Sequence, residues 1–244
     1  MILLLALAIA PGLLISVLIY ALDRYDKEPL PLLTRSFTLG VMCTLLPLAI
    51  QYSAQKLGVK PDSSNAWHIA AFSFLLIGIS EEVTKFLVLR FYAYPKAAFN
   101  EPYDGIVYSV LISMGFATAE NIVYVSQYGV GTAIARMFLA VPAHAAFAIM
   151  MGYFVGLAKF SPRPDRPLLF LQAIAYPVIF HGAYDFFLLL DSGAYLMFGS
   201  IAALYIATKF SIKAIKRHRE ISEYIHEHEH KSDHHDQQND DFIY

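Results

Sequence analysis

The chain has 244 residues, of which 57% are hydrophobic and only 16% are charged, and its mean hydropathy is +0.49. A soluble domain carries about 45–50% apolar and about 25% charged residues, so this composition excludes an ordinary soluble globular protein. The formal net charge of −2 gives no indication of a nucleic-acid partner.

Apolar segments follow one another along the whole chain, each long enough to cross about 30 Å of hydrocarbon as a helix. Seven can be drawn: residues 2–22, 33–55, 66–90, 104–127, 132–158, 168–190 and 194–214. The first segment has no basic residue ahead of its apolar core and no clear cleavage site, so we expect a retained helix rather than a signal peptide. The sequence therefore predicts an all-α, polytopic membrane helix bundle of about seven transmembrane helices over residues 1–216.

Positively charged residues indicate how this bundle is oriented, because cytoplasmic connections carry an excess of Lys and Arg. One side of the predicted bundle holds Arg24, Lys27, Lys96, Lys159, Arg163, Arg166, Lys213, Lys216, Arg217 and Arg219. The other side keeps chiefly Lys56 and Lys60. This bias predicts an amino terminus outside and a carboxyl terminus inside. The histidine-rich segment 217–244 is expected to be a disordered cytoplasmic tail, because it has few apolar residues to bury.

The third apolar segment contains charged residues where lipid is expected. The stretch GISEEVTKFL, residues 78–87, holds Glu81, Glu82 and Lys85. A charged side chain near the bilayer centre costs about 2.5–3.5 kcal/mol on insertion scales, so these groups are expected to face the bundle interior. Lys85 follows the two glutamates by four and three residues, so one carboxylate can pair with it while the other faces a site. A salt bridge that only fixes helix packing explains the same pattern.

The fourth segment adds a further acid. Ser109, Ser113, Glu120 and Tyr124 fall near one helical face, and Asn121 follows the glutamate. A lone glutamate in this position also fits a simple hydrogen bond to a neighbouring helix.

The fifth segment places His144 on the same face as Gly152 and Gly156, which form a GxxxG motif for close helix packing. A single histidine there is also explained as a hydrogen-bonding core residue.

The sixth segment contains YPVIFHGAYDFF, in which His181 and Asp185 are four residues apart and share a face. Pro177 is expected to kink this helix, since it removes a backbone donor. Irregular backbone at membrane depth is tolerated where protein or water satisfies it, so the kink suggests a nearby cavity.

Together these motifs predict that two histidines and several carboxylates converge from four helices. Two histidines and a glutamate are a familiar ligand set for a hydrolytic zinc ion, with a further glutamate able to act as general base. The same residues can instead activate water without a metal.

At this point the motifs EEVTK, FATAEN, HAAFAIMMGYFVG and HGAYD resemble the motif set of PrsW-type intramembrane proteases. That family is related to the CAAX prenyl endopeptidases and to the APH-1 scaffold of gamma-secretase. The resemblance covers roughly residues 66–190, in the same order on successive helices. It implies a bacterial, multi-pass plasma-membrane hydrolase that acts in regulated intramembrane proteolysis. Its substrate would be a single-pass membrane protein, an anti-sigma factor, whose site-1 cleavage releases a sigma factor.

Carried onto this sequence, the resemblance implies one set of catalytic positions: Glu81, Glu82, Glu120, His144, His181 and Asp185. Glu81 or Glu82 would be the general base. The candidate zinc ligands are Glu120, His144 and His181, which would bind the metal or, without it, polarise the water and the scissile carbonyl. Asp185 would orient His181, and Lys85 and Asn121 would give electrostatic support. Glu120 stands where the CAAX endopeptidases place histidine, so their role assignment does not transfer directly.

Two other classes of protein remain compatible with buried Glu, Lys and His. A non-catalytic scaffold would use them to join helices, as the relation to APH-1 suggests. A proton or cation transporter would use them as a relay, although no inverted halves of comparable pattern occur in the sequence.

Overall fold

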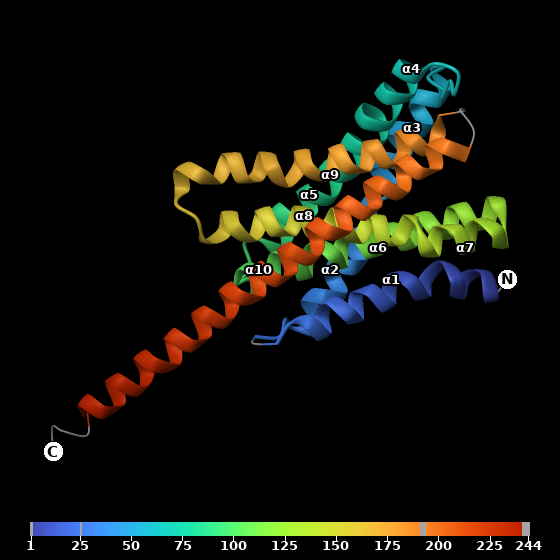
Figure 1. Cartoon of the computed structure of the whole chain (residues 1–244). Helices are drawn as coiled ribbons and strands as arrows, with labels where there is room; N and C mark the ends of the chain where they lie inside the picture. Colours follow the sequence, from blue (N-terminus) through green and yellow to red (C-terminus); the bar gives the residue numbers. More distant parts are fainter. Residues whose placement is uncertain (1, 25, 191–193, 241–244) are drawn as a thin grey trace.

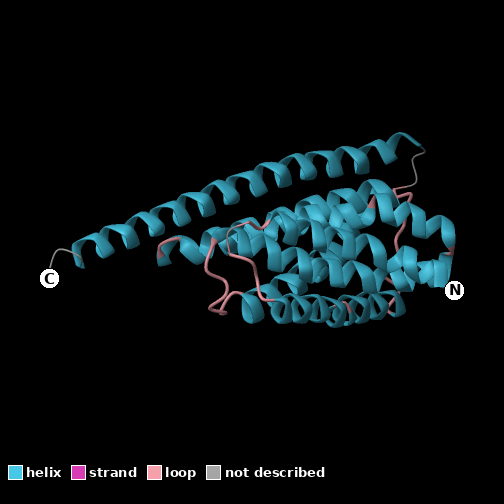
Figure 2. Cartoon of the chain, turned by 90° about the horizontal axis from the view of Figure 1, so that it is seen from below, coloured by secondary structure: helices cyan, strands magenta, loops and turns pink. Residues whose placement is uncertain are grey.

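The computed structural model describes the backbone of residues 2–24, 26–190 and 194–240 and the side chains of 3–24, 26–190 and 198–227. Helices are the only regular secondary structure over these residues (Figures 1 and 2). In chain order they are α1 (Ile2–Leu22), α2 (Leu30–Cys43), α3 (Leu45–Lys56), α4 (Ala66–Ala70), the π-helical η1 (Ala71–Gly78), α5 (Ile79–Val88), the π-helical η2 (Leu89–Ala93), α6 (Pro102–Tyr128), α7 (Val130–Phe138), α8 (Ala140–Phe160), the 3₁₀ turn η3 (Arg163–Asp165), α9 (Arg166–Leu189) and α10 (Ala194–Asp240). The predicted all-α class is confirmed.

Most of the predicted membrane segments are present as long helical stretches. Within the described residues, six are long and apolar enough to cross a membrane: Leu3–Leu22, Leu30–Lys56, Pro102–Tyr128, Val130–Phe160, Arg163–Leu189 and Phe198–Glu227. The remaining predicted segment, 66–90, is the helical run from α4 to η2, which changes between α and π geometry. The chain is therefore a multi-pass membrane protein, as its composition predicts.

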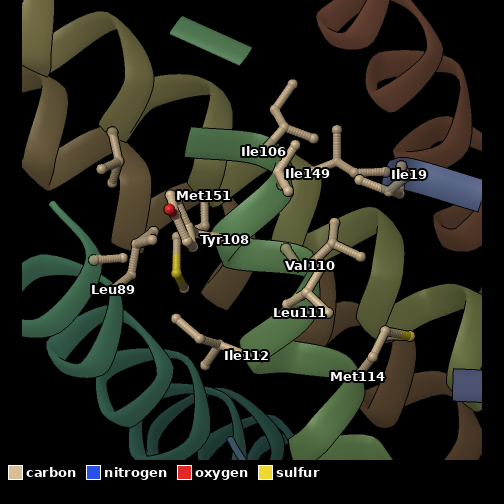
Figure 3. Close-up of a cluster of buried hydrophobic side chains, with 14 of the residues drawn as sticks. Ile19, Leu89, Ile106, Tyr108, Val110, Leu111, Ile112, Met114, Ile149 and Met151 are labelled. Atoms are coloured by element: carbon tan, nitrogen blue, oxygen red, sulfur yellow. The ribbon is translucent and has the colours of Figure 1, made fainter. Parts of the chain in front are cut away.

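Helix α6 forms the centre of the bundle. It contacts α1, α2, α7, α8 and α10. Its apolar side chains Ile106, Val110, Ile112 and Met114 are fully buried, and Figure 3 shows them packed together with residues of the surrounding helices. A helix that is apolar on all sides is stable only where other elements or lipid cover it. Side chains on α6 are thus fixed in position by neighbours on every side.

Close helix contacts occur where glycines face one another. A methyl group on Gly105 of α6 would overlap the carbonyl oxygen of Gly152 on α8, and one on Gly152 would overlap the backbone at Gly105. Gly156 meets α6 one turn further along, at Pro102. The predicted close-packing face of the fifth segment is confirmed, and it is the face that carries His144.

The outer surface of the bundle is strongly apolar. Leu14 and Val17 of α1, Phe91 of η2 and Leu171 of α9 are each at least 60% exposed. In water such a surface would be costly, whereas hydrocarbon provides it with apolar contacts.

Helix α9 continues through Pro177 without ending there, and its kink at this proline stays a prediction. Irregular backbone also occurs in the third segment, where η1 and η2 flank α5. Hydrogen bonding in the π pattern therefore lies directly next to the acidic motif.

The carboxyl-terminal segment from residue 217, predicted as a disordered tail, has helical backbone over its described residues. The backbone of α10 continues as a helix to Asp240 and extends away from the bundle (Figures 1 and 2). Its first turns past 217 have packing partners: His218 is fully buried and stacks on Tyr153 with ring centroids 4.5 Å apart. Further along, the His226 ring lies 3.8 Å from the Glu101 carboxylate. The composition of the tail does not indicate these contacts, because they depend on packing against other helices, such as that of His218 against Gly156 of α8. The histidines beyond His226 lie outside the described side chains.

Candidate active site

The acidic motif of α5 is held against α9 by an unusually close approach of the two backbones. A Cβ placed on Gly78 would lie 3.3 Å from the carbonyl oxygen of Val178, and Gly182 lies against the ring of Phe74. A Cβ on Gly182 would come within 2.4 Å of the Phe74 ring, closer than Cβ atoms approach in proteins, whereas the contact at Gly78 is tight but longer. This approach brings the glutamate pair on α5 within reach of His181.

Four buried side chains from α5, α8 and α9 form one cluster. Glu81, Glu82, His144 and His181 each offer a ligand atom, and these atoms all lie within 4.8 Å of one another. His181 Nδ1 is 2.7 Å from Glu82 Oε1, and His181 Nε2 is 3.9 Å from Glu81 Oε2. The rings of the two histidines meet edge to face with centroids 5.2 Å apart. The structure therefore brings together residues that lie up to 100 positions apart in the sequence.

Lys85 reaches into this cluster from α5. Its Nζ lies 2.7 Å from Glu82 Oε1, 3.6 Å from Glu81 Oε2 and 3.3 Å from His144 Nδ1. The ammonium also sits 4.2 Å from the centroid of the Phe116 ring, and the side chain is only 2% exposed. Lys85 thus contributes one positive charge between two carboxylates.

Glu120 lies behind His144 rather than in the cluster of four. Its Oε2 is 2.9 Å from His144 Nε2 and 3.0 Å from Arg136 Nη2. A lysine ammonium can only donate, so His144 accepts at Nδ1, and its Nε2–H then donates to Glu120. The carboxylate therefore fixes both the tautomer and the orientation of this ring. The candidate zinc set of Glu120, His144 and His181 does not coincide with the observed cluster, in which Glu81 and Glu82 stand beside the histidines.

Two further residues of the site escape the motif analysis. Arg136 on α7 donates from Nε to Asn121 Oδ1 at 2.6 Å and lies above the Tyr124 ring, 4.3 Å from its centroid. Gln51 on α3 donates to Glu81 Oε1 at 3.2 Å. Arg136 precedes His144 by two helical turns, and an arginine inside an apolar stretch is a usable signal. Gln51 carries no comparable signal.

Asp185 completes the arrangement around His181. Its Oδ2 lies 3.4 Å from His181 Nε2, and the Phe147 ring stacks on the imidazole with centroids 5.2 Å apart. The shared face predicted from their spacing is present in α9.

A cavity of about 330 Å³ opens beside the cluster. Its polar wall consists of Gln51, Glu81, Glu120, Arg136, His144, His181 and Asp185. Its apolar wall includes Ile77, Leu139, Phe147, Tyr184, Leu188 and Leu189. Glu81 lines the cavity, whereas its described neighbour Glu82 does not. The cavity reaches the end of the bundle at which α6 and α9 terminate, and its mixture of apolar and polar walls suits a peptide segment.

The donor set of the cluster fits a zinc ion. Zinc in hydrolytic sites takes imidazole nitrogen and carboxylate oxygen, usually from three protein side chains. Among the described residues, Glu81 Oε2 and Glu82 Oε2 are buried without a hydrogen-bond partner, which is costly unless another group meets them. Carboxylate oxygens in this state are available to a cation.

Comparison with known proteins places the chain in a family. The family model described as "PrsW family intramembrane metalloprotease" matches residues 28–211. The Protease PrsW of Geobacillus kaustophilus (strain HTA426) is 38% identical over 214 residues, which cover 87% of this chain and 92% of that protein. The Protease PrsW of Bacillus subtilis (strain 168) is 37% identical over 215 residues, covering 88% and 94%. No solved structure matches the chain. The match extends over most of the chain and includes every element that contributes to the cluster, so the chain belongs to the PrsW family of intramembrane metalloproteases and is a peptidase of the bacterial plasma membrane.

Proposed function

We propose that the chain makes the first cut in a membrane-anchored anti-sigma factor, by adding water to a peptide bond held in the cavity beside Glu81. The observation that carries the chemistry is the unequal use of the two glutamates. Each glutamate has one oxygen without a hydrogen-bond partner, but Glu82 is enclosed between Lys85 and His181, whereas Glu81 lines the cavity. Glu81 is therefore placed to take a proton from water.

The roles of the neighbouring residues follow from their contacts. Gln51 holds one oxygen of Glu81, which orients the other for general-base catalysis. Glu82 fixes His181 through Nδ1, so that Nε2 faces Asp185 and Glu81. In this orientation His181 is held beside Glu81 as a candidate metal ligand. Glu120 and Asp185 orient the two histidines, as carboxylates do behind catalytic imidazoles.

Glu82, His144 and His181 are the residues that would hold a zinc ion, leaving Glu81 as the base. A zinc ion in this position supplies a Lewis acid for the water and for the carbonyl oxygen. The family description as metalloproteases and the buried donor set support zinc as the cofactor.

The substrate is inferred from the position of the cavity and from the resemblance of the motifs to those of PrsW-type proteases. With the amino terminus outside, as the Lys and Arg distribution predicts, the cavity opens toward the outer face of the membrane. A single-pass anti-sigma factor presents its extracytoplasmic stem at this level, and the apolar exterior of the bundle allows its helix to approach through lipid.

The proposal is tested by cleavage of tagged, single-pass anti-sigma factors by the full-length chain in proteoliposomes. Glu81→Gln and His181→Ala should abolish cleavage while both proteins accumulate normally, and Glu220→Gln, an exposed change on α10, should cleave like the parent. Full turnover by the Glu81→Gln protein would remove the base from the proposal. Cleavage of other single-pass proteins but of no anti-sigma factor would refute the substrate while leaving the chemistry intact.

A further inference from the structure

Lys85 has a place in the site that peptide hydrolysis by Glu81 and His181 does not require. Lys85 is not among the described residues that line the cavity. Its ammonium nevertheless contacts three of the four members of the buried cluster: Glu82 at 2.7 Å, His144 Nδ1 at 3.3 Å and Glu81 at 3.6 Å. A lysine that served only to join helices would need only one of these three partners.

Lys85 donates to His144 Nδ1, the ring nitrogen whose lone pair a metal ion would use, and to the Glu82 carboxylate, which is the second residue of the proposed zinc set. Zinc bonds to carboxylate oxygen and imidazole nitrogen at about 2.0–2.2 Å, so an ion held by Glu82 and His144 would lie close to the place of this ammonium. The Lys85 ammonium already lies between these two groups and hydrogen-bonds to both. The two cations therefore compete for one position.

We propose that the Lys85 ammonium is a built-in substitute cation, which occupies the metal position of the metal-free chain and must be displaced from Glu82 and His144 when a divalent ion binds. This inference rests on the proposed function, in which zinc is the cofactor.

Two features of the surroundings make this exchange physically reasonable. Without any cation, two adjacent carboxylates would be buried with uncompensated charge, which is strongly destabilising, so the metal-free bundle needs Lys85. When the ammonium is displaced, the face of Phe116, 4.2 Å away, continues to offer it a cation–π contact. The chain can therefore remain folded in both states, and metal affinity is lowered by the cost of moving the lysine.

The test is zinc binding by the purified full-length chain in detergent, measured by calorimetry. All proteins carry alanine at His228, His230, His234 and His235, because these tail histidines offer unrelated zinc ligands. The variants are Lys85→Met, which removes the charge, Lys85→Arg, which keeps it, and Lys209→Met, a matched control exposed on α10 with its ammonium over Tyr205.

We expect Lys85→Met to bind one zinc ion with a Kd lower by roughly tenfold or more than the parent, because a unit charge a few ångströms from the ion has been removed. The zinc Kd of Lys85→Arg and of Lys209→Met should stay within about twofold of that of the parent. A tenfold change in Kd corresponds to about 1.4 kcal/mol. In chelator, Lys85→Met should unfold at a lower temperature than the parent, and zinc should close this gap. Magnesium, which prefers oxygen ligands and retains water, should not.

Equal or weaker zinc binding by Lys85→Met would overturn the proposal, as would equally tight binding by Lys85→Arg. If Lys85→Met does not fold, Lys85→Gln is used, and failure of both to fold even when zinc is present also overturns it. Cleavage by the parent is measured in parallel, with and without chelator. If no protein binds zinc and the parent still cleaves, the displacement of Lys85 is refuted, whereas the proposed hydrolysis is not. If the zinc affinities rank as expected but no substrate is cleaved, the proposed function is refuted instead.

Discussion

Glu81 and Glu82 are neighbours in the sequence but have different surroundings in the structure: Glu81 lines the cavity, and Glu82 is enclosed between Lys85 and His181, each 2.7 Å from its Oε1. Consecutive residues of a helix point about 100° apart, so one turn of α5 presents one carboxylate to water and the other to protein. Replacement of the two residues should therefore have different effects.

Removing the base alone should affect the chemical step. Glu81→Gln keeps the shape of the side chain and its neighbour Gln51 but cannot accept a proton. General-base catalysis contributes about 10²–10⁴-fold, so kcat should fall by this amount with little change in KM. Initial rates of cleavage in proteoliposomes provide the measurement. A raised KM with unchanged kcat would assign Glu81 to substrate binding.

Arg136 should act through Glu120 rather than on the substrate. Arg136→Met leaves Glu120 without its 3.0 Å partner, and the orientation of His144 should loosen. Mutation of a residue that helps to orient a metal-binding histidine typically lowers activity or metal affinity by about 10–100-fold. Arg136→Lys should recover part of the loss, and Arg163→Met, at an exposed position beyond the other end of the bundle, should lose nothing. Activity of Arg136→Met equal to the parent would show that Glu120 needs no partner.

The close packing of α6 on α8 should not tolerate an added methyl group. Gly105→Ala would place its Cβ against the Gly152 carbonyl, and overpacking of this kind costs about 1–3 kcal/mol. Gly131→Ala is the matched control, since no atom lies within 4 Å of a Cβ built there. Thermal unfolding in detergent should show a lower Tm for the first variant only.

Stability should depend on pH through the connection between α1 and α2. Burial raises the pKa of Glu28 to about 7 and that of Asp23 to about 6. Tyr108 donates a hydrogen bond to Glu28, which only partly offsets this rise in its pKa. A carboxyl group with a pKa higher in the folded than in the unfolded chain binds more protons when folded, so stability falls as pH rises between the two values.

For Glu28 this interval runs from the ordinary pKa of 4.5 to about 7. Glu28→Gln should flatten the fall of Tm over this range, because the amide cannot ionise, whereas exposed Glu220→Gln should leave the profile unchanged. A Tm that rises across this interval in the parent would contradict the assignment.

The sequence predicts the helices well because the length of an apolar segment is a local property of the sequence. Segment 2–22 coincides with α1, and segment 104–127 lies within α6 (Pro102–Tyr128). The acid and histidine motifs also indicate the correct helices for the cluster. Their pairings are less accessible, because they depend on distances between helices rather than on spacing along one of them.

Arg136 illustrates this limit. It contacts Glu120 from α7, a helix separate from α8, and an apolar segment drawn as 132–158 does not show this division. The π geometry of η1 and η2 is likewise invisible to a pattern that assumes a regular helical repeat. The helical course of α10 beyond 217 depends on contacts such as His218 on Tyr153, which composition does not encode.

The two π-helical segments on either side of α5 also decide how length changes affect this protein. Each π turn holds an extra residue compared with an α turn, so deletion of one residue from η1 can restore α geometry without interrupting the helix. Because the wider turn absorbs the extra residue, such a deletion leaves the segments on either side of it nearly in phase, and Glu81 should keep its side of the helix. A deletion within α5 itself has no such buffer, since each missing residue of a regular α-helix turns the following side chains by about 100°.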